Sequence, residues 1–372
     1  MGRFYQDVFY TYSDVTIIPA KISNIEHRGE CNPFDRKGML PLFASPMDTV
    51  VSEENFEKFE SERIYPILPR TVDLSKRIEY SVKGKWAAYS LEEFERTFCD
   101  CDNKVETNYC ELHTLIDVAN GHMSKIIDVV RTAKMIYGHE IKIMAGNIAN
   151  PKTYYDYAYA GIDYVRVGIG SGLGCTTQSN VGVGCGMATL INKVAECKQA
   201  YCEQNGIDVN DATKIIADGG IRDYSDIIKA LALGADYVMC GSLFCKMLES
   251  AAKKKCDANI TALSDVKDID KNEFWWFGTY NGEEIILGNI KAEFYGMASR
   301  EGQIAMNGSK TKTSEGIKKT LMVEYTMHGW CENFIDFLRS SMSYVGVYNL
   351  HDFRRYAILA INSPCAIAAV NK

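Results

Sequence analysis

Eight short apolar runs, separated by longer amphipathic stretches, constrain the fold of this chain more than any other feature. Strand-sized apolar runs that alternate with helical patterns predict βα units and a parallel sheet. The predicted strands are 40–44, 64–68, 86–89, 115–118, 141–144, 164–167, 214–217 and 237–240. Eight such units predict an α/β fold, a (β/α)8 TIM barrel, and barrels of this length are usually one domain. A doubly wound sheet is the alternative, but its early glycine fingerprint is missing.

Most of the predicted strands end in a cluster of polar residues or glycines. These clusters are residues 45–48, 117–121, 145–147, 168–177, 218–220 and 241–242. In a barrel of parallel strands the carboxyl ends converge on one face, where active sites lie. We therefore expect the chemistry of this protein at that face.

A single cysteine, Cys175, lies in the glycine-rich segment 168–177, directly after the apolar run 163–167. Glycines allow a positive φ and a close approach of backbone to ligand. A thiol among exposed amides and hydroxyls is placed to act as a nucleophile. Most free cysteines instead pack as small hydrophobes, so this segment alone leaves both interpretations open.

Two further motifs follow the last two predicted strands, Asp218-Gly219-Gly220 and Gly241-Ser242. Loops at these places in a barrel present backbone amides to a phosphate. The Asp218 carboxylate can accept hydrogen bonds from ribose hydroxyls. The glycines could also simply turn the chain, but both motifs together favour a phosphorylated ligand.

Composition excludes several classes of protein. The net charge is -7 and the only brief basic run is 253–255, which argues against nucleic-acid binding. The sequence contains no run of eighteen apolar residues, so we predict no membrane span. The 13 cysteines show no paired spacing and residues 1–10 hold no apolar signal core, so we expect a reduced, cytoplasmic protein. Cys99 and Cys101, without a second pair, are a weak zinc signal.

Several motifs together resemble the IMP dehydrogenase/GMP reductase family. They occur in the family's order at residues 12–15, 46–50, 117–121, 144–147, 170–178, 217–222, 294–297, 315–316 and 338–340. The resemblance therefore covers nearly the whole chain.

This resemblance implies a barrel, usually a homotetramer, that acts at C2 of a purine nucleoside monophosphate with a nicotinamide cofactor. Cys175 matches the nucleophile, and Thr177 matches the hydroxyl that helps to activate water or ammonia. Asp117 and Asn147 match residues on the nicotinamide side. The implied substrate-binding residues are Ser171, Gly172, Asp218, Gly219, Gly220, Gly241, Ser242, Gly296, Met297 and Glu315. A monovalent cation, K+, would lie at Gly170, Gly172 and Cys175.

The segment before Glu315-Gly316 indicates which member the chain resembles most. Family dehydrogenases carry an Arg-Tyr pair on a long flap, whereas residues 305–316 are short and contain neither. The stretch between Trp86 and Leu115 is too small for the dehydrogenases' regulatory module. We therefore expect a single catalytic domain, 1–372, with a short active-site flap at 300–325. These features favour GMP reductase with NADPH.

Other residues keep alternatives open. Residues 218–222 and 45–48 resemble the dehydrogenase more than the reductase. The reductase's proton-transferring glutamate would occupy position 300, where this chain has Arg300 followed by Glu301, our third catalytic candidate. Leu173 replaces a serine that contacts phosphate. The alternatives are an NAD-dependent IMP dehydrogenase that forms XMP and a purine-nucleotide-binding member with reduced catalysis.

The segment between the last predicted strand and Phe294 is longer than expected. We interpret 250–293 as an insertion that contains Trp275-Trp276 and a hairpin turn at 280–283. Its aromatic residues fit an interface or a lid, and equally a small satellite core beneath a hairpin.

Overall fold

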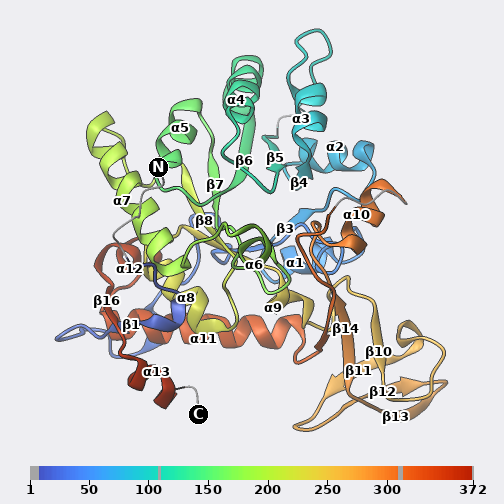
Figure 1. Cartoon of the computed structure of the whole chain (residues 1–372). Helices are drawn as coiled ribbons and strands as arrows, with labels where there is room; N and C mark the ends of the chain where they lie inside the picture. The colour runs from blue at the N-terminus through green and yellow to red at the C-terminus, as the bar shows by residue number, and fades with distance from the viewer. Residues whose placement is uncertain (1–7, 108–109, 309–312, 371–372) are drawn as a thin grey trace.

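Eight parallel strands form a closed barrel at the centre of the molecule (Figure 1). The computed structural model describes residues 8–107, 110–308 and 313–370. The barrel strands are β2 (Leu42–Ala44), β3 (Tyr65–Leu68), β4 (Trp86–Tyr89), β5 (Leu112–Asp117), β6 (Ile141–Ile148), β7 (Tyr164–Val167), β8 (Lys214–Asp218) and β9 (Tyr237–Cys240). Each overlaps a predicted apolar run, and β9 pairs with β2 to close the barrel. The prediction of a (β/α)8 barrel is confirmed.

Helices connect the strands on the outside of the barrel. Those between consecutive barrel strands are α1 (Phe56–Ser61), α2 (Leu74–Val82), α3 (Leu91–Phe98), α4 (Ser124–Tyr137), α5 (Thr153–Ala160), α6 (Thr177–Val181), α7 (Met187–Asn205) and α8 (Tyr224–Ala232). Those after β9 are α9 (Ser242–Cys245), α10 (Arg300–Asn307), α11 (Met327–Val345), α12 (Leu350–Tyr356) and α13 (Pro364–Val370). Helix α3 begins at a capping box in which Ser90 and Glu93 satisfy each other's backbone amides. None of the helices within the described ranges is long and apolar enough to cross a membrane.

The described residues also form short 3-10 helices, namely η1 (Tyr12–Asp14), η2 (Arg28–Glu30), η3 (Gly138–Glu140) and η4 (Leu263–Asp265). The barrel interior is a packed core rather than a pore, as is usual for this architecture. Its buried members are Phe43, Ile67, Trp86, Ala88, Leu115, Met144, Ile216 and Met239. At the amino-terminal end of the strands, Asp35 Oδ2 accepts hydrogen bonds from Tyr65 at 2.7 Å and Tyr237 at 3.1 Å. These contacts close the barrel interior at that end, so a site inside the barrel lies at the other end.

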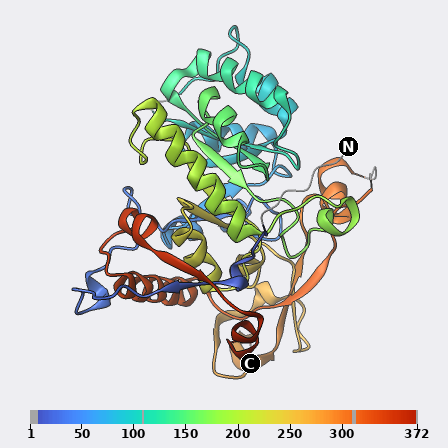
Figure 2. The same cartoon turned by 60° about the vertical axis from the view of Figure 1, so that its left-hand side comes forward.

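A strand from the early part of the chain pairs with a strand from its late part on one flank of the barrel. Strand β1 (Val15–Ile18) pairs antiparallel with β16 (Ile358–Ile361), and Figure 2 shows the blue and red segments running together. Tyr12, just before β1, is 1% exposed. The N-terminal segment is therefore part of the barrel's surroundings and not a separate unit.

The segment after β9 forms two small antiparallel sheets outside the barrel (Figure 1). Their strands are β10 (Lys254–Cys256), β11 (Lys267–Lys271), β12 (Trp276–Tyr280), β13 (Glu283–Gly288), β14 (Ile290–Phe294) and β15 (Lys319–Met322). Asn281 and Gly282, with φ of 53° and 84°, make the two-residue turn between β12 and β13.

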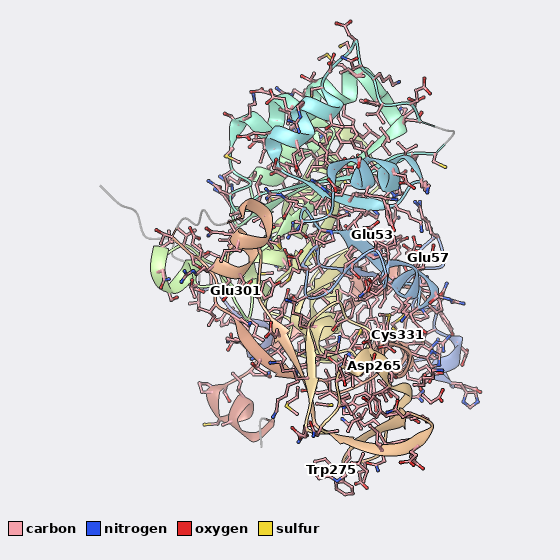
Figure 3. All side chains as sticks on the ribbon, turned by 90° about the vertical axis from the view of Figure 1, so that its right-hand side faces the viewer. Glu53, Glu57, Asp265, Trp275, Glu301 and Cys331 are labelled. Carbon is pink, nitrogen blue, oxygen red and sulfur yellow. The ribbon has the colours of Figure 1, made fainter. Side chains whose placement is uncertain are left out.

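The two tryptophans of this segment have opposite environments. The Trp276 indole is buried and donates to the Val323 carbonyl at 3.0 Å, so it holds the β11–β13 sheet against the chain after β15. Trp275 is 47% exposed, and Figure 3 shows it at the outer end of the segment.

Candidate active site

The carboxyl ends of the barrel strands surround a hollow of about 250 Å³. Most of the predicted site residues line it: Asp117, Asn147, Gly170, Ser171, Gly172, Cys175, Asp218, Gly219, Gly220, Gly241, Ser242, Gly296, Met297 and Glu315. Thr177 and Glu301 lie outside this lining. Ligand pockets usually measure roughly 300–1,000 Å³, so the hollow is slightly smaller than most of them.

Cys175 is exposed on the loop that follows β7 and begins a chain of hydrogen bonds. Its thiol donates to Thr177 Oγ1 at 3.2 Å, and the Thr177 hydroxyl donates to Glu315 Oε2 at 2.7 Å. A nucleophile, a hydroxyl and a carboxylate within hydrogen-bond reach of one another are the components of proton transfer beside a covalent step. Thr177 thus contacts both Cys175 and Glu315 although it does not line the hollow.

The segment that carries Glu315 lies over the cysteine loop. The Thr176 amide donates to the Glu315 carbonyl at 2.9 Å, and the Ile317 amide donates to the Gly174 carbonyl at 2.9 Å. On its other side, the Glu315 amide donates to the Ala298 carbonyl at 3.1 Å. Backbone hydrogen bonds therefore hold the Glu315 side chain next to Thr177.

Glu301 occupies a different place. It lies in the first turn of α10, and Figure 3 shows it on that helix. The carboxylate that hydrogen-bonds to Thr177 belongs to Glu315. Residues 309–312 of the predicted flap lie outside the described residues.

Arg166 joins the two aspartates of the site. Its guanidinium is 2.6 Å from Asp117 Oδ1 and 2.8 Å from Asp218 Oδ2. The Asn147 amide also donates to Asp218 Oδ2, at 2.7 Å. Burial by itself lowers the pKa of Arg166, but the two carboxylates more than offset it and the pKa is raised. Asp218 Oδ1 accepts no hydrogen bond from the described residues and remains available to a ligand.

Sequence reasoning missed Arg166 as a site residue. Its signal was present, because it is the one charged side chain within the otherwise apolar strand β7, Tyr164–Val167. Arg166 is 7% exposed. Charged side chains are almost never buried without partners, so an arginine inside a barrel strand indicates acidic residues on the neighbouring strands.

The glycines at the end of β7 and β8 are required by a close backbone approach. A Cβ on Gly168, where φ is +140°, would lie 2.1 Å from the Asp218 carbonyl oxygen. Only glycine therefore lets the cysteine loop leave β7 directly beside Asp218.

On the side of the hollow where we predicted a phosphate, some hydrogen-bonding groups already have partners within the protein. The Gly220 amide donates to the Ser171 carbonyl at 3.0 Å. The Ser171 hydroxyl is buried and has no hydrogen-bond partner among the described residues. Because an unpaired buried polar group is unfavourable, this hydroxyl marks a position that a ligand or water would complete. Leu173, on the same loop, lines the hollow and is 43% exposed.

The structure contains few candidates for a metal. In the described ranges no group of three or more His, Cys, Asp or Glu residues could hold a metal ion. All 13 cysteines are free, Cys99 and Cys101 included. At the predicted monovalent-cation site, the Gly172 carbonyl accepts a hydrogen bond from the Cys175 amide at 3.0 Å.

Comparisons with known proteins agree with the fold. A model of the IMP dehydrogenase / GMP reductase domain matches residues 111–267. A GMP reductase of Staphylococcus saprophyticus is 27% identical over 355 residues, which are 93% of each chain. A GMP reductase of Staphylococcus epidermidis is 30% identical over 249 residues, 65% of this chain and 72% of that protein.

Dehydrogenases match a smaller share of their own length. An inosine-5'-monophosphate dehydrogenase of Chlorobaculum parvum is 35% identical over 242 residues, 64% of this chain and 43% of that protein. The fold, the site and these relatives together define an oxidoreductase on a (β/α)8 barrel. The chain belongs to the IMP dehydrogenase/GMP reductase family, as the resemblance predicted.

Proposed function

We propose that this protein catalyses the NADPH-dependent reductive deamination of GMP to IMP. The observation that carries the proposal is the exposed Cys175 at the rim of the hollow, with Thr177 between its thiol and the Glu315 carboxylate. The curated GMP reductases that align over 93% of this chain support the same reaction.

In this reaction the Cys175 sulfur forms a bond to C2 of GMP, and the bond from C2 to the exocyclic amino group breaks. The Thr177 hydroxyl, which is hydrogen-bonded to Glu315, passes a proton to the departing ammonia. NADPH, when bound, supplies the hydride that C2 receives. The bond between sulfur and C2 then breaks and IMP leaves. Overall, GMP, NADPH and two protons give IMP, ammonium and NADP+.

The remaining site residues bind and orient the ligands. Asp218 Oδ1 accepts from a ribose hydroxyl, and Asp117 and Asn147 face the nicotinamide. Ser171 and Gly172 of the cysteine loop, with Gly219, Gly220, Gly241 and Ser242, hold the phosphate; Gly296, Met297 and Glu315 contact the base. We assign the proton-transferring role to Glu315 instead of Glu301, because Glu315 hydrogen-bonds to Thr177.

Further assignments belong to the same proposal. Carbonyl oxygens of the loop at Gly170, Gly172 and Cys175 suit K+, because hard cations take oxygen ligands. Residues 1–372 act as one catalytic domain with an insertion at 250–293 and a flap at 300–325. The enzyme acts as a homotetramer in the cytoplasm, a compartment that keeps 13 free cysteines reduced.

A second candidate is an NAD-dependent IMP dehydrogenase that forms XMP. The hydrogen bond from Thr177 to Glu315 favours it, because a carboxylate that accepts from a hydroxyl can act as a general base toward water. The two reactions differ in whether the proton moves toward or away from Glu315.

Purified protein tests these alternatives directly. With GMP and NADPH, the reductase consumes cofactor absorbance; with IMP and NAD, the dehydrogenase generates it. Binding of a nucleotide without either change would indicate a purine-nucleotide-binding member with reduced catalysis. Cys175→Ala should abolish turnover and keep nucleotide binding, and turnover that survives this change would remove Cys175 as the nucleophile.

A further inference from the structure

The amino-terminal face of the barrel, opposite the active site, carries a second hollow of about 1060 Å³. It is bounded by the starts of several barrel strands, by the loop before β2 and by α12. One corner of this hollow is formed by Arg36, Asn210, Lys214, His351 and Arg354. None of these residues belongs to the active site.

Three cations, Arg36, Lys214 and Arg354, lie at this corner, and the carboxylates of Asp208, Asp211 and Asp236 are close to it. Lys214 forms no ion pair with any described residue, and its ammonium contacts the Asn210 carbonyl. The nearby Asp236 is paired with Lys198 at 2.7 Å, whereas Arg354 lies 4.0 Å from the other Asp236 oxygen. Lys198, Lys214 and Arg354 therefore share the single Asp236 carboxylate, and Lys198 holds its shortest contact.

Arg36 adds a third cation at the rim of the hollow. Its guanidinium is 3.6 Å from Asp211, and the two side chains are 77% and 70% exposed. Exposed pairs of this kind are weak, so Arg36 can exchange its partner for a ligand.

The pKa of Lys214 is lowered mainly by burial and, to a smaller extent, by the neighbouring cations. Burial lowers the pKa of its ammonium to about 8, Asp236 opposes that shift, and Lys198, Arg354 and Arg36 add to it. An anion bound at the corner would stabilise the charged lysine.

We propose that the corner formed by Arg36, Lys214 and Arg354 binds an anion with two or more linked phosphate groups. Arginine forks and a lysine ammonium are the usual phosphate-binding groups, and three cations around a concave surface suit a compact polyvalent anion. An extended nucleic acid would need a basic stripe, which the sequence lacks. This site does not depend on the reaction proposed above.

Isothermal titration of the full chain with inorganic tripolyphosphate and, separately, with ATP tests this proposal. The unmodified protein should bind, and its affinity should fall as salt concentration rises. Lys214→Met and Arg36→Met should each weaken binding by about tenfold or more, because each removes a charge-assisted hydrogen bond. Neither change should unfold the protein. In Lys214→Met, Asp236 still forms its ion pair with Lys198, and the side chain replaced in Arg36→Met is 77% exposed.

Two control variants locate the anion. Lys21→Met removes an exposed lysine that lies outside the hollow and has no ion pair among the described residues, so affinity should not change. Ser242→Asp places a negative charge at the barrel mouth and should leave tripolyphosphate binding intact. Tighter binding of ATP than of tripolyphosphate would identify a nucleotide, and equal binding a plain polyphosphate; both support the site.

The proposal is wrong if neither probe binds at millimolar concentration or if Lys214→Met binds as well as the unmodified protein. It is also wrong if Ser242→Asp alone abolishes binding, because the anion would then lie at the active site. A short oligonucleotide that binds more tightly than both probes, with the same loss in Lys214→Met, would replace the small anion by a nucleic acid.

Discussion

Thr177 Oγ1 donates a hydrogen bond to Glu315 Oε2 at 2.7 Å, although 138 residues separate the two in the chain. The same hydroxyl accepts from the Cys175 thiol at 3.2 Å. The three side chains meet because the backbone around Glu315 is hydrogen-bonded to the cysteine loop. A proton can therefore pass between Glu315 and the reacting centre through one hydroxyl.

Glu315→Gln should lower kcat by about a hundredfold or more, the usual contribution of a positioned proton donor or acceptor. The amide is isosteric and can still accept from Thr177, so the fold should persist. Steady-state kinetics with the favoured substrate pair measures the effect. Glu301→Gln should cause a much smaller loss, and a larger loss in Glu301→Gln than in Glu315→Gln would contradict the assignment of Glu315.

Arg166→Met should reduce the free energy of unfolding by about 3–5 kcal/mol, because it leaves two poorly solvated carboxylates without their partner. The side chains of Asp117 and Asp218 are 15% and 17% exposed. Denaturant unfolding provides the measurement. The triple variant Arg166→Met, Asp117→Asn, Asp218→Asn should recover part of the loss, since it removes the uncompensated charges. Unchanged stability in Arg166→Met would show that the ion pairs are not important to the fold.

Leu173→Ser should tighten the binding of a nucleoside monophosphate by about tenfold, because it adds a hydroxyl donor to a charged phosphate. Leu173 is 43% exposed, so the free energy of unfolding should change by less than about 0.5 kcal/mol. The comparison is between titrations with GMP and with guanosine. An equal gain for guanosine would mean that the new hydroxyl does not contact phosphate.

The stability of the protein should fall in mild acid because of His113. Burial, with a further contribution from Lys37, lowers its pKa from 6.5 to about 4, against an opposing effect of Glu111. The unfolded chain therefore takes up a proton at a pH where the folded state does not. The contribution of neutral His113 to the free energy of unfolding is complete above pH 6.5. It is lost progressively as the pH falls toward 4, by up to about 3 kcal/mol.

Unfolding measured across this pH range tests the role of His113. His113→Phe should flatten the pH dependence and preserve the stacking on Trp86, where the ring centroids are 4.6 Å apart. His139→Phe, at an exposed position, should leave the pH dependence of the free energy of unfolding unchanged. If the pH dependence of unfolding persists in His113→Phe, another titrating group causes it.

The neighbouring tryptophans of the 250–293 segment should differ sharply on substitution. Trp276→Ala should destabilise the protein by about 3–5 kcal/mol, since it empties a buried site and removes the hydrogen bond to Val323. Trp275→Ala should change the free energy of unfolding by less than about 0.5 kcal/mol, because Trp275 is 47% exposed. Denaturant unfolding of both variants gives the comparison, and equal effects would contradict the observed packing.

The barrel could be predicted because burial on both faces of a parallel strand leaves a continuous apolar run in the local sequence. The positions at which the strands begin and end were predicted less accurately. Strand β5 begins at Leu112 and not at 115, because the polar residues His113 and Thr114 are buried in it. Strand β6 runs to Ile148, four residues past the predicted run.

The sequence by itself determined which residues stand at the strand ends, and most of those lie around one hollow. The tertiary structure decided which of them are partners. Arg166 forms hydrogen bonds with aspartates 49 and 52 residues away in the chain. Thr177 donates a hydrogen bond to Glu315 and not to Glu301. The physical reason is that burial periodicity is a local property of the chain, whereas a hydrogen bond depends on distances that exist only after the barrel has closed.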